Sequence, residues 1–110
     1  PLSQNQRETM HRFKVAGIKK QMLEDARKAI ARAHVPATPQ ANVVLHWQQP
    51  DRRGRDGDGA APALKACLDA LVKEEVLVDD SWRYVRHSGI TCHDPVPGEP
   101  GRFWLEVQPI

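Results

Sequence analysis

The stretch from Ala41 to Gln48 restricts most strongly how this chain can fold. Every second side chain on one face is large and apolar, namely Val43, Leu45 and Trp47. This alternation is that of a β-strand with one side turned to a core. The chain is therefore expected to build a sheet, with other elements packed on it.

Two segments have the three- and four-residue spacing of apolar side chains that predicts a helix. The first is expected from Thr9 to Ala33, with an apolar stripe of Val15, Ile18, Met22, Ala26, Ala29 and Ala33. Gly17 weakens its middle, and prolines after Ala33 end it. The second helix is expected to start at Pro62 and to bury Leu64, Cys67, Leu68, Leu71 and Val72.

Two further strands are expected, from Trp82 to Thr91 and from Arg102 to Gln108. The order helix, strand, helix, strand, strand predicts an α/β (mixed α+β) fold, a small mixed β-sheet with two main helices packed on it. With 110 residues, the chain has the size of a single domain, covering residues 1–110. The aromatic residues of the late strands are candidates for the core or an interface: Trp82, Phe103 and Trp104.

Composition excludes several classes of protein. The apolar runs are a few residues long, against about 18 for a membrane span, and no signal peptide is visible. The two cysteines, Cys67 and Cys92, lie outside any C-x-x-C pattern, so we expect an intracellular protein with reduced thiols and no structural zinc. The two glycine-rich motifs that bind the phosphates of nucleotides, G-x-x-x-x-G-K-[ST] and G-x-G-x-x-G, are both missing from the sequence, so no nucleotide cofactor is expected.

The charge is unevenly distributed along the chain. Residues 7–34 hold eight basic and three acidic residues (+5), and residues 35–110 hold eight basic and eleven acidic ones (−3), within a total of +2. The basic side of the first helix is either a solvated surface or a DNA contact. The candidates for that contact are Lys19, Lys20, Arg27 and Lys28.

An Arg- and Asp-rich segment follows the first predicted strand, and it carries the clearest chemical signal. Its sequence, residues 50–59, is PDRRGRDGDG. Hard cations such as Mg²⁺ take carboxylate oxygens, and arginines bind phosphates.

Asp79 and Asp80 precede the next strand, so Asp80 can reach the same site if the two strands pair. The alternative is a solvated loop held by local ion pairs. An EF-hand and a catalytic triad of Ser88, a histidine and Asp94 are not expected.

In these residues the chain resembles the RusA family of Holliday junction resolvases, which are mostly encoded by phages and prophages. Residues 1–5 (PLSQN) are similar to an early P-P-S-x-N segment of the family. Residues 50–58 resemble its Arg-rich run leading into D-x-D. Lys65 with residues 68–71 (LDAL), followed by residues 76–80 (VLVDD), resembles the next helix and acidic pair. The resemblance covers nearly the whole chain.

The resemblance implies a Mg²⁺-dependent endonuclease, with Mn²⁺ as a possible substitute, that cuts four-way DNA junctions as a homodimer in the cytoplasm of a bacterial host. Asp56, Asp58 and Asp80 would bind the metal. Lys65 would be the catalytic lysine, stabilising charge on the phosphate. The arginines Arg52, Arg53 and Arg55 would contact the DNA backbone. A two-fold dimer matches the symmetric cleavage of two strands.

Two departures from the family pattern bear on this expectation. Gly59 stands where the family usually has Asn directly after D-x-D, so an amide at the site is missing and activity is expected to be weaker or altered. The family's first strand, before the P-P-S-x-N segment, is absent from the sequence, as if the chain were truncated. Alternative functions are a broader flap and fork endonuclease, or a branched-DNA binding module with weak or no cleavage.

Overall fold

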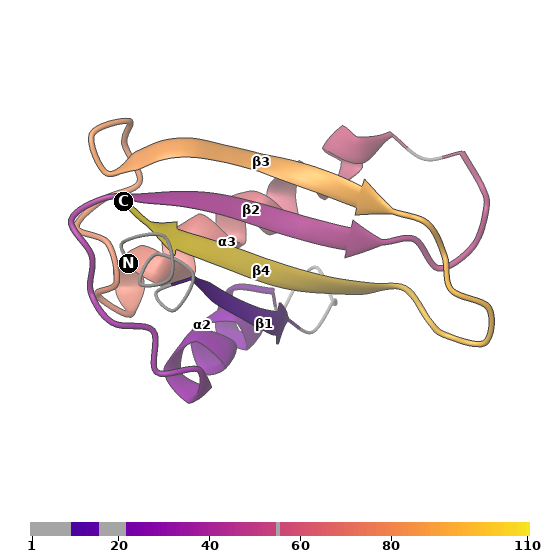
Figure 1. Ribbon diagram of the computed structural model, residues 1–110, viewed down its shortest axis with the longest axis horizontal. Helices are drawn as coiled ribbons and strands as arrows, with labels where there is room; N and C mark the ends of the chain where they lie inside the picture. The colour runs from indigo at the N-terminus through magenta and orange to yellow at the C-terminus, as the bar shows by residue number, and fades with distance from the viewer. Residues whose placement is uncertain (1–9, 16–21, 55) are drawn as a thin grey trace, which may run out of the picture.

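The fold is a four-stranded sheet with two helices. The computed structural model describes residues 10–15, 22–54 and 56–110, without the side chain of Asp58. The elements follow one another as β1 (His11–Val15), α2 (Met22–Arg32), β2 (Ala41–Gln48), η2 (Gly57–Ala60), α3 (Ala61–Lys73), β3 (Val85–His93) and β4 (Arg102–Pro109). In space the strands are ordered β1-β4-β2-β3 (Figure 1). Only the β2–β3 pair is parallel; β4 is antiparallel to both of its neighbours.

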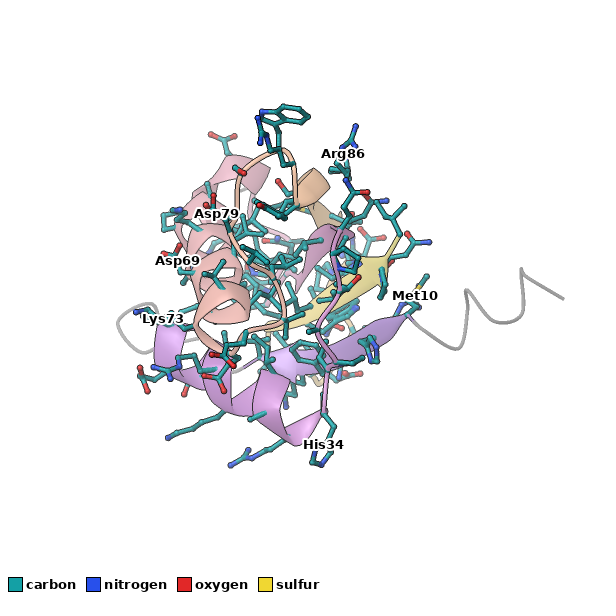
Figure 2. The ribbon with its side chains drawn as sticks, turned by 90° about the vertical axis from the view of Figure 1, so that its left-hand side faces the viewer. Met10, His34, Asp69, Lys73, Asp79 and Arg86 are labelled. Atoms are coloured by element: carbon teal, nitrogen blue, oxygen red, sulfur yellow. The ribbon has the colours of Figure 1, made fainter. Side chains whose placement is uncertain are left out.

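Both helices lie against the same face of the sheet and contact each other, and none of the described elements covers the opposite face (Figure 2). We call this opposite face the uncovered face. The core fills the space between the helices and the sheet. Its largest fully buried side chains are Met22, Ile30, Leu45, Leu71, Leu105, Val15, Val43, Val76, Val107 and Cys67. Burial raises the pKa of the Cys67 thiol to about 12, so this cysteine is an uncharged core group.

The predicted fold class is confirmed: the sheet is mixed and two main helices cover it. The strand β2 has the bounds that the alternation predicts. The helix α3 begins with Pro62 in its first two positions, where the missing N–H of proline costs no hydrogen bond. It ends at Lys73, with Glu74 as its C-cap. The next residue, Glu75, has a positive φ of 61°, which lets the Val76 N–H donate back to the Leu71 carbonyl at 2.9 Å.

The predicted helix from Thr9 to Ala33 is wrong at its start. His11–Val15 forms the strand β1, which pairs antiparallel with β4 through Val15↔Phe103 and His11↔Val107; α2 begins only at Met22. The apolar spacing misled because Val15 is buried in either arrangement. These five residues form a strand rather than a helix because their side chains alternate between inward and outward positions and because an edge of β4 is free to pair with them.

The strand predicted from Trp82 to Thr91 begins and ends later, at Val85 and His93. Residues 82–84 form a turn, because the Ser81 carbonyl accepts hydrogen bonds from the N–H groups of Tyr84 and Val85, both at 2.9 Å. Trp82 consequently lies outside the sheet and the core. Among the described residues, no helix has the length and apolarity to cross a membrane.

Candidate functional site

The parallel β2–α3–β3 unit places the acidic segments of the sequence. After β2, the chain runs through an exposed loop into η2, and the N–H of Gly59 donates to the Asp56 carbonyl at 3.0 Å. The side chain of Asp56 is exposed. Because η2 continues directly into α3, Asp58 is fixed in the chain just before the helix that carries Lys65.

The short helix η2 packs against the end of β3. A Cβ added to Gly57 would lie 3.3 Å from the Sγ atom of Cys92, so glycine allows a close approach at this point. This contact holds the start of α3 beside the sheet.

Among the predicted site residues whose side chains the structure describes, Lys65 and Asp80 are in direct contact. The Lys65 ammonium donates to Asp80 Oδ2 at 2.6 Å and lies 3.2 Å from Asp69 Oδ1, one helical turn further along α3. The segment after α3 therefore returns alongside the helix, and Asp80 contacts it near its start. Lys65 is four residues, or about 6 Å along the helix axis, from the first residue of α3. Figure 2 shows Asp69 and Asp79 on this same flank of the molecule.

The contact fixes the charges of both groups. The Lys65 ammonium, through its hydrogen bond and its charge, lowers the pKa of the Asp80 carboxyl. The two carboxylates Asp80 and Asp69 raise the pKa of Lys65. Lys65 is therefore a cation at neutral pH, suited to stabilising negative charge and unsuited to acting as a general base. The side chains are 63% (Lys65) and 28% (Asp80) exposed, so a phosphate or a metal ion can reach them.

The donor chemistry of the acidic residues fits a hard divalent cation, since carboxylate oxygens are the ligands that Mg²⁺ and Mn²⁺ take. The structure brings Asp80 to Lys65, while Asp56 lies in the loop before η2. Among the described side chains, no three His, Cys, Asp or Glu residues are grouped so that they could hold a metal. The side chain of Asp58, the central member of the predicted set, lies outside that description.

The predicted DNA-contacting residues fall into three groups. Arg52, Arg53 and Lys28 are exposed, as a phosphate contact requires. Arg27 is engaged within the protein: its Nε donates to Glu74 Oε2 at 2.7 Å, linking α2 to the C-cap of α3. The remaining three, Lys19, Lys20 and Arg55, lie outside the described residues.

A second polar group, on the uncovered face of the sheet, was not predicted. His46 Nε2 lies 2.9 Å from Glu106 Oε1, and His46 Nδ1 lies 2.8 Å from His93 Nε2. A carboxylate only accepts, so His46 Nε2 carries a proton and donates to Glu106. Trp104 stacks on His46 at 5.1 Å, and burial together with His46 lowers the pKa of His93.

This group joins three strands, β2, β3 and β4, and Arg12 extends it to β1 through an ion pair with Glu106 at 3.3 Å. Alternation along β2 places His46 on the uncovered face, and this much is readable in the sequence. Its partners depend on the strand order, which the sequence pattern does not contain.

No protein-family model matches the chain, and no curated protein matches it either.

Proposed function

We propose that this chain is a Mg²⁺-dependent endodeoxyribonuclease of the RusA type, active also with Mn²⁺, that resolves four-way DNA junctions by paired symmetric nicks. The observation that carries the proposal is the 2.6 Å contact between Lys65 and Asp80. These residues are 15 positions apart, and the resemblance assigns both to one catalytic centre. Their contact brings the two side chains close together, which supports their assignment to one centre.

Each residue has a distinct part in this proposal. Asp56, Asp58 and Asp80 would hold the metal, which when bound supplies a nucleophile at neutral pH and charge stabilisation at the phosphate. Lys65 carries a fixed positive charge beside Asp80, and this charge offsets the one that builds on the phosphate as the P–O bond breaks. Asp69 keeps the ammonium in place from the same helix.

The wider setting follows from the reaction. Two strands of a four-way junction have to be cut symmetrically, so we propose a homodimer with one site in each protomer. The exposed Arg52 and Arg53 would contact the DNA backbone beside the metal ligands. The substrate, branched DNA of a bacterial host or its phage, places the enzyme in the host cytoplasm.

The proposal is tested with a synthetic four-way junction, incubated with and without Mg²⁺. The wild type is expected to make paired nicks only with the metal, and Asp58→Asn is expected to bind the junction without cutting it. Asp94→Asn, in the exposed loop after β3, is the matched control and should cut normally. Wild-type protein that binds but makes no cut in Mg²⁺ or Mn²⁺ would be a binding module, and the nuclease proposal would be abandoned.

Lys65→Ala separates the lysine's catalytic role from a phosphate contact. Loss of a preorganised cation at a developing charge costs about 10²–10³-fold in rate, so the variant should cut slowly while its junction affinity changes little. Equal losses in rate and affinity would reduce Lys65 to a phosphate contact. Comparing junctions with flaps and forks in the same assay identifies the broader endonuclease if all three substrates are cut equally well.

A further inference from the structure

Trp82 has an unusual position for a tryptophan. Its side chain is 70% exposed, and it is the only aromatic among the strongly exposed large apolar residues of the described chain. The turn that carries it is closed on the Ser81 carbonyl. Trp82 does not pack in the core, so its exposed indole is available to contact a partner.

Hydrogen bonds before the turn and within it hold the turn in place. Before it, Asp80 is bound to Lys65 on α3. Within it, the Arg83 carbonyl accepts from the side chain of Gln40 at 3.0 Å, and the Tyr84 carbonyl accepts from the Ala41 N–H at 2.9 Å. A fixed turn presents the indole at a defined place, and little conformational freedom is lost when a partner binds it.

Two guanidinium groups flank the indole ring. The Cζ atoms of Arg83 and Arg86 lie 5.8 Å and 5.9 Å from the Trp82 ring centroid, within the range of cation–π attraction. Figure 2 shows Arg86 reaching out from the protein. An exposed aromatic face with two exposed cations beside it complements one chemistry above all, a nucleic acid strand, whose bases stack and whose phosphates are anionic.

We propose that Trp82, Arg83 and Arg86 form a binding surface for an unstacked base and its phosphates at the branch point of the DNA. The indole stacks on the base, and the guanidinium groups hold the adjoining phosphates. Within a duplex each base is already stacked on both sides, so an exposed indole finds a free base face only where stacking is interrupted, as at a branch. Trp82 is two residues from Asp80, so the surface lies next to the proposed cutting site. This inference rests on the proposed function.

The test measures junction binding by fluorescence anisotropy in EDTA, where no cleavage occurs. Base stacking on an aromatic residue contributes 1–3 kcal/mol by alanine substitution, so Trp82→Ala should weaken junction binding by roughly 5- to 150-fold. Trp82→Phe should retain most of the affinity. Val96→Ala, at a residue 40% exposed in the distant 94–101 loop, is the matched control and should bind as the wild type does.

The arginines and the base have readouts of their own. The double variant Arg83→Ala, Arg86→Ala should reduce the slope of log affinity against log salt by about 1.4–1.8, which corresponds to two phosphate contacts. Lys73→Ala, at the last residue of α3, is the control and should leave the slope unchanged. Replacing the branch-point nucleotides by abasic ones should remove the difference between wild type and Trp82→Ala. A persistent difference would overturn the stacking proposal.

The remaining outcomes distinguish this inference from the proposed function. If the wild type cuts junctions and Trp82→Ala binds them equally well, the stacking surface is refuted and the nuclease stands. If Trp82→Ala turns a dimer into monomers, the surface is a contact between copies of the chain, and the inference is again refuted. If the wild type binds no branched DNA, both proposals fail together.

Discussion

Replacing Gly101 by alanine should destabilise the protein through a single steric conflict. A Cβ at this position would lie 2.9 Å from Pro50 Cδ and 3.0 Å from both Pro50 Cβ and Pro50 N, against 3.4–4 Å for ordinary contact. Three atoms of a rigid ring would have to move by about 0.5 Å, and overpacking of this kind costs about 1–3 kcal/mol. The backbone of Gly101 is not in the left-handed region, so no strain of φ adds to this figure.

Urea unfolding measures the effect as a loss in the free energy of unfolding, and thermal unfolding as a drop of roughly 4–8 °C per kcal/mol. Gly54→Ala is the matched control, because nothing lies within 4 Å of its added Cβ; it should leave stability unchanged or raise it by about 0.4–1 kcal/mol. Adding Pro50→Ala to Gly101→Ala removes the nearest atom, Cδ, and should restore part of the loss. Equal stabilities of the Gly101 and Gly54 variants would refute the steric argument.

Two further predictions concern the candidate site. Lys65 lowers the pKa of Asp80, so the stability that this carboxylate contributes should be complete above its ordinary pKa of about 3.9 and be lost as the pH falls through the lowered folded value. The free energies of unfolding of wild type and Asp80→Asn, measured in urea, should therefore approach each other below about pH 4. In a Lys65→Ala background this pH dependence should disappear. A difference in free energy that stays constant with pH would contradict the assignment. Gly59→Asn supplies the amide that the RusA pattern has, and open space around the position accommodates it. The free energy of unfolding should change by less than about 0.5 kcal/mol, and the initial rate of junction cleavage should rise. An unchanged rate would show that the glycine does not limit activity.

The fold was largely predictable where one pattern had one interpretation. The alternation in β2 and the proline at the start of α3 gave both elements correctly, since a half-buried strand and a first helical turn leave few alternatives. The start of the chain was not predictable from periodicity, because Val15 fits an apolar helix stripe as well as a strand. The partner that decides the question, β4, is about 90 residues further along.

The candidate site shows the same division. The resemblance proposed Lys65 and Asp80 as site residues, and the structure describes a contact between these two side chains. The sequence also predicted that Asp80 would reach the loop holding Asp56, and no such contact is described. The hydrogen-bonded group around His46 and the exposed turn at Trp82 were missed. Both depend on which strands are neighbours and on where β3 begins, and these are properties of the assembled sheet.

The position of β4 within the sheet also determines when the protein can fold. It is the last described strand along the chain, yet it lies between β1 and β2. A ribosome delivers residues in order, so β1 and β2 emerge long before the strand that joins them, and β1 closes a loop of about 90 residues when it pairs. Pairing over such a separation is slow, and both strands keep unpaired edges until then. The apolar surfaces of β1 and β2 therefore stay open to aggregation until β4 has been made, unless α2 and α3 cover them first.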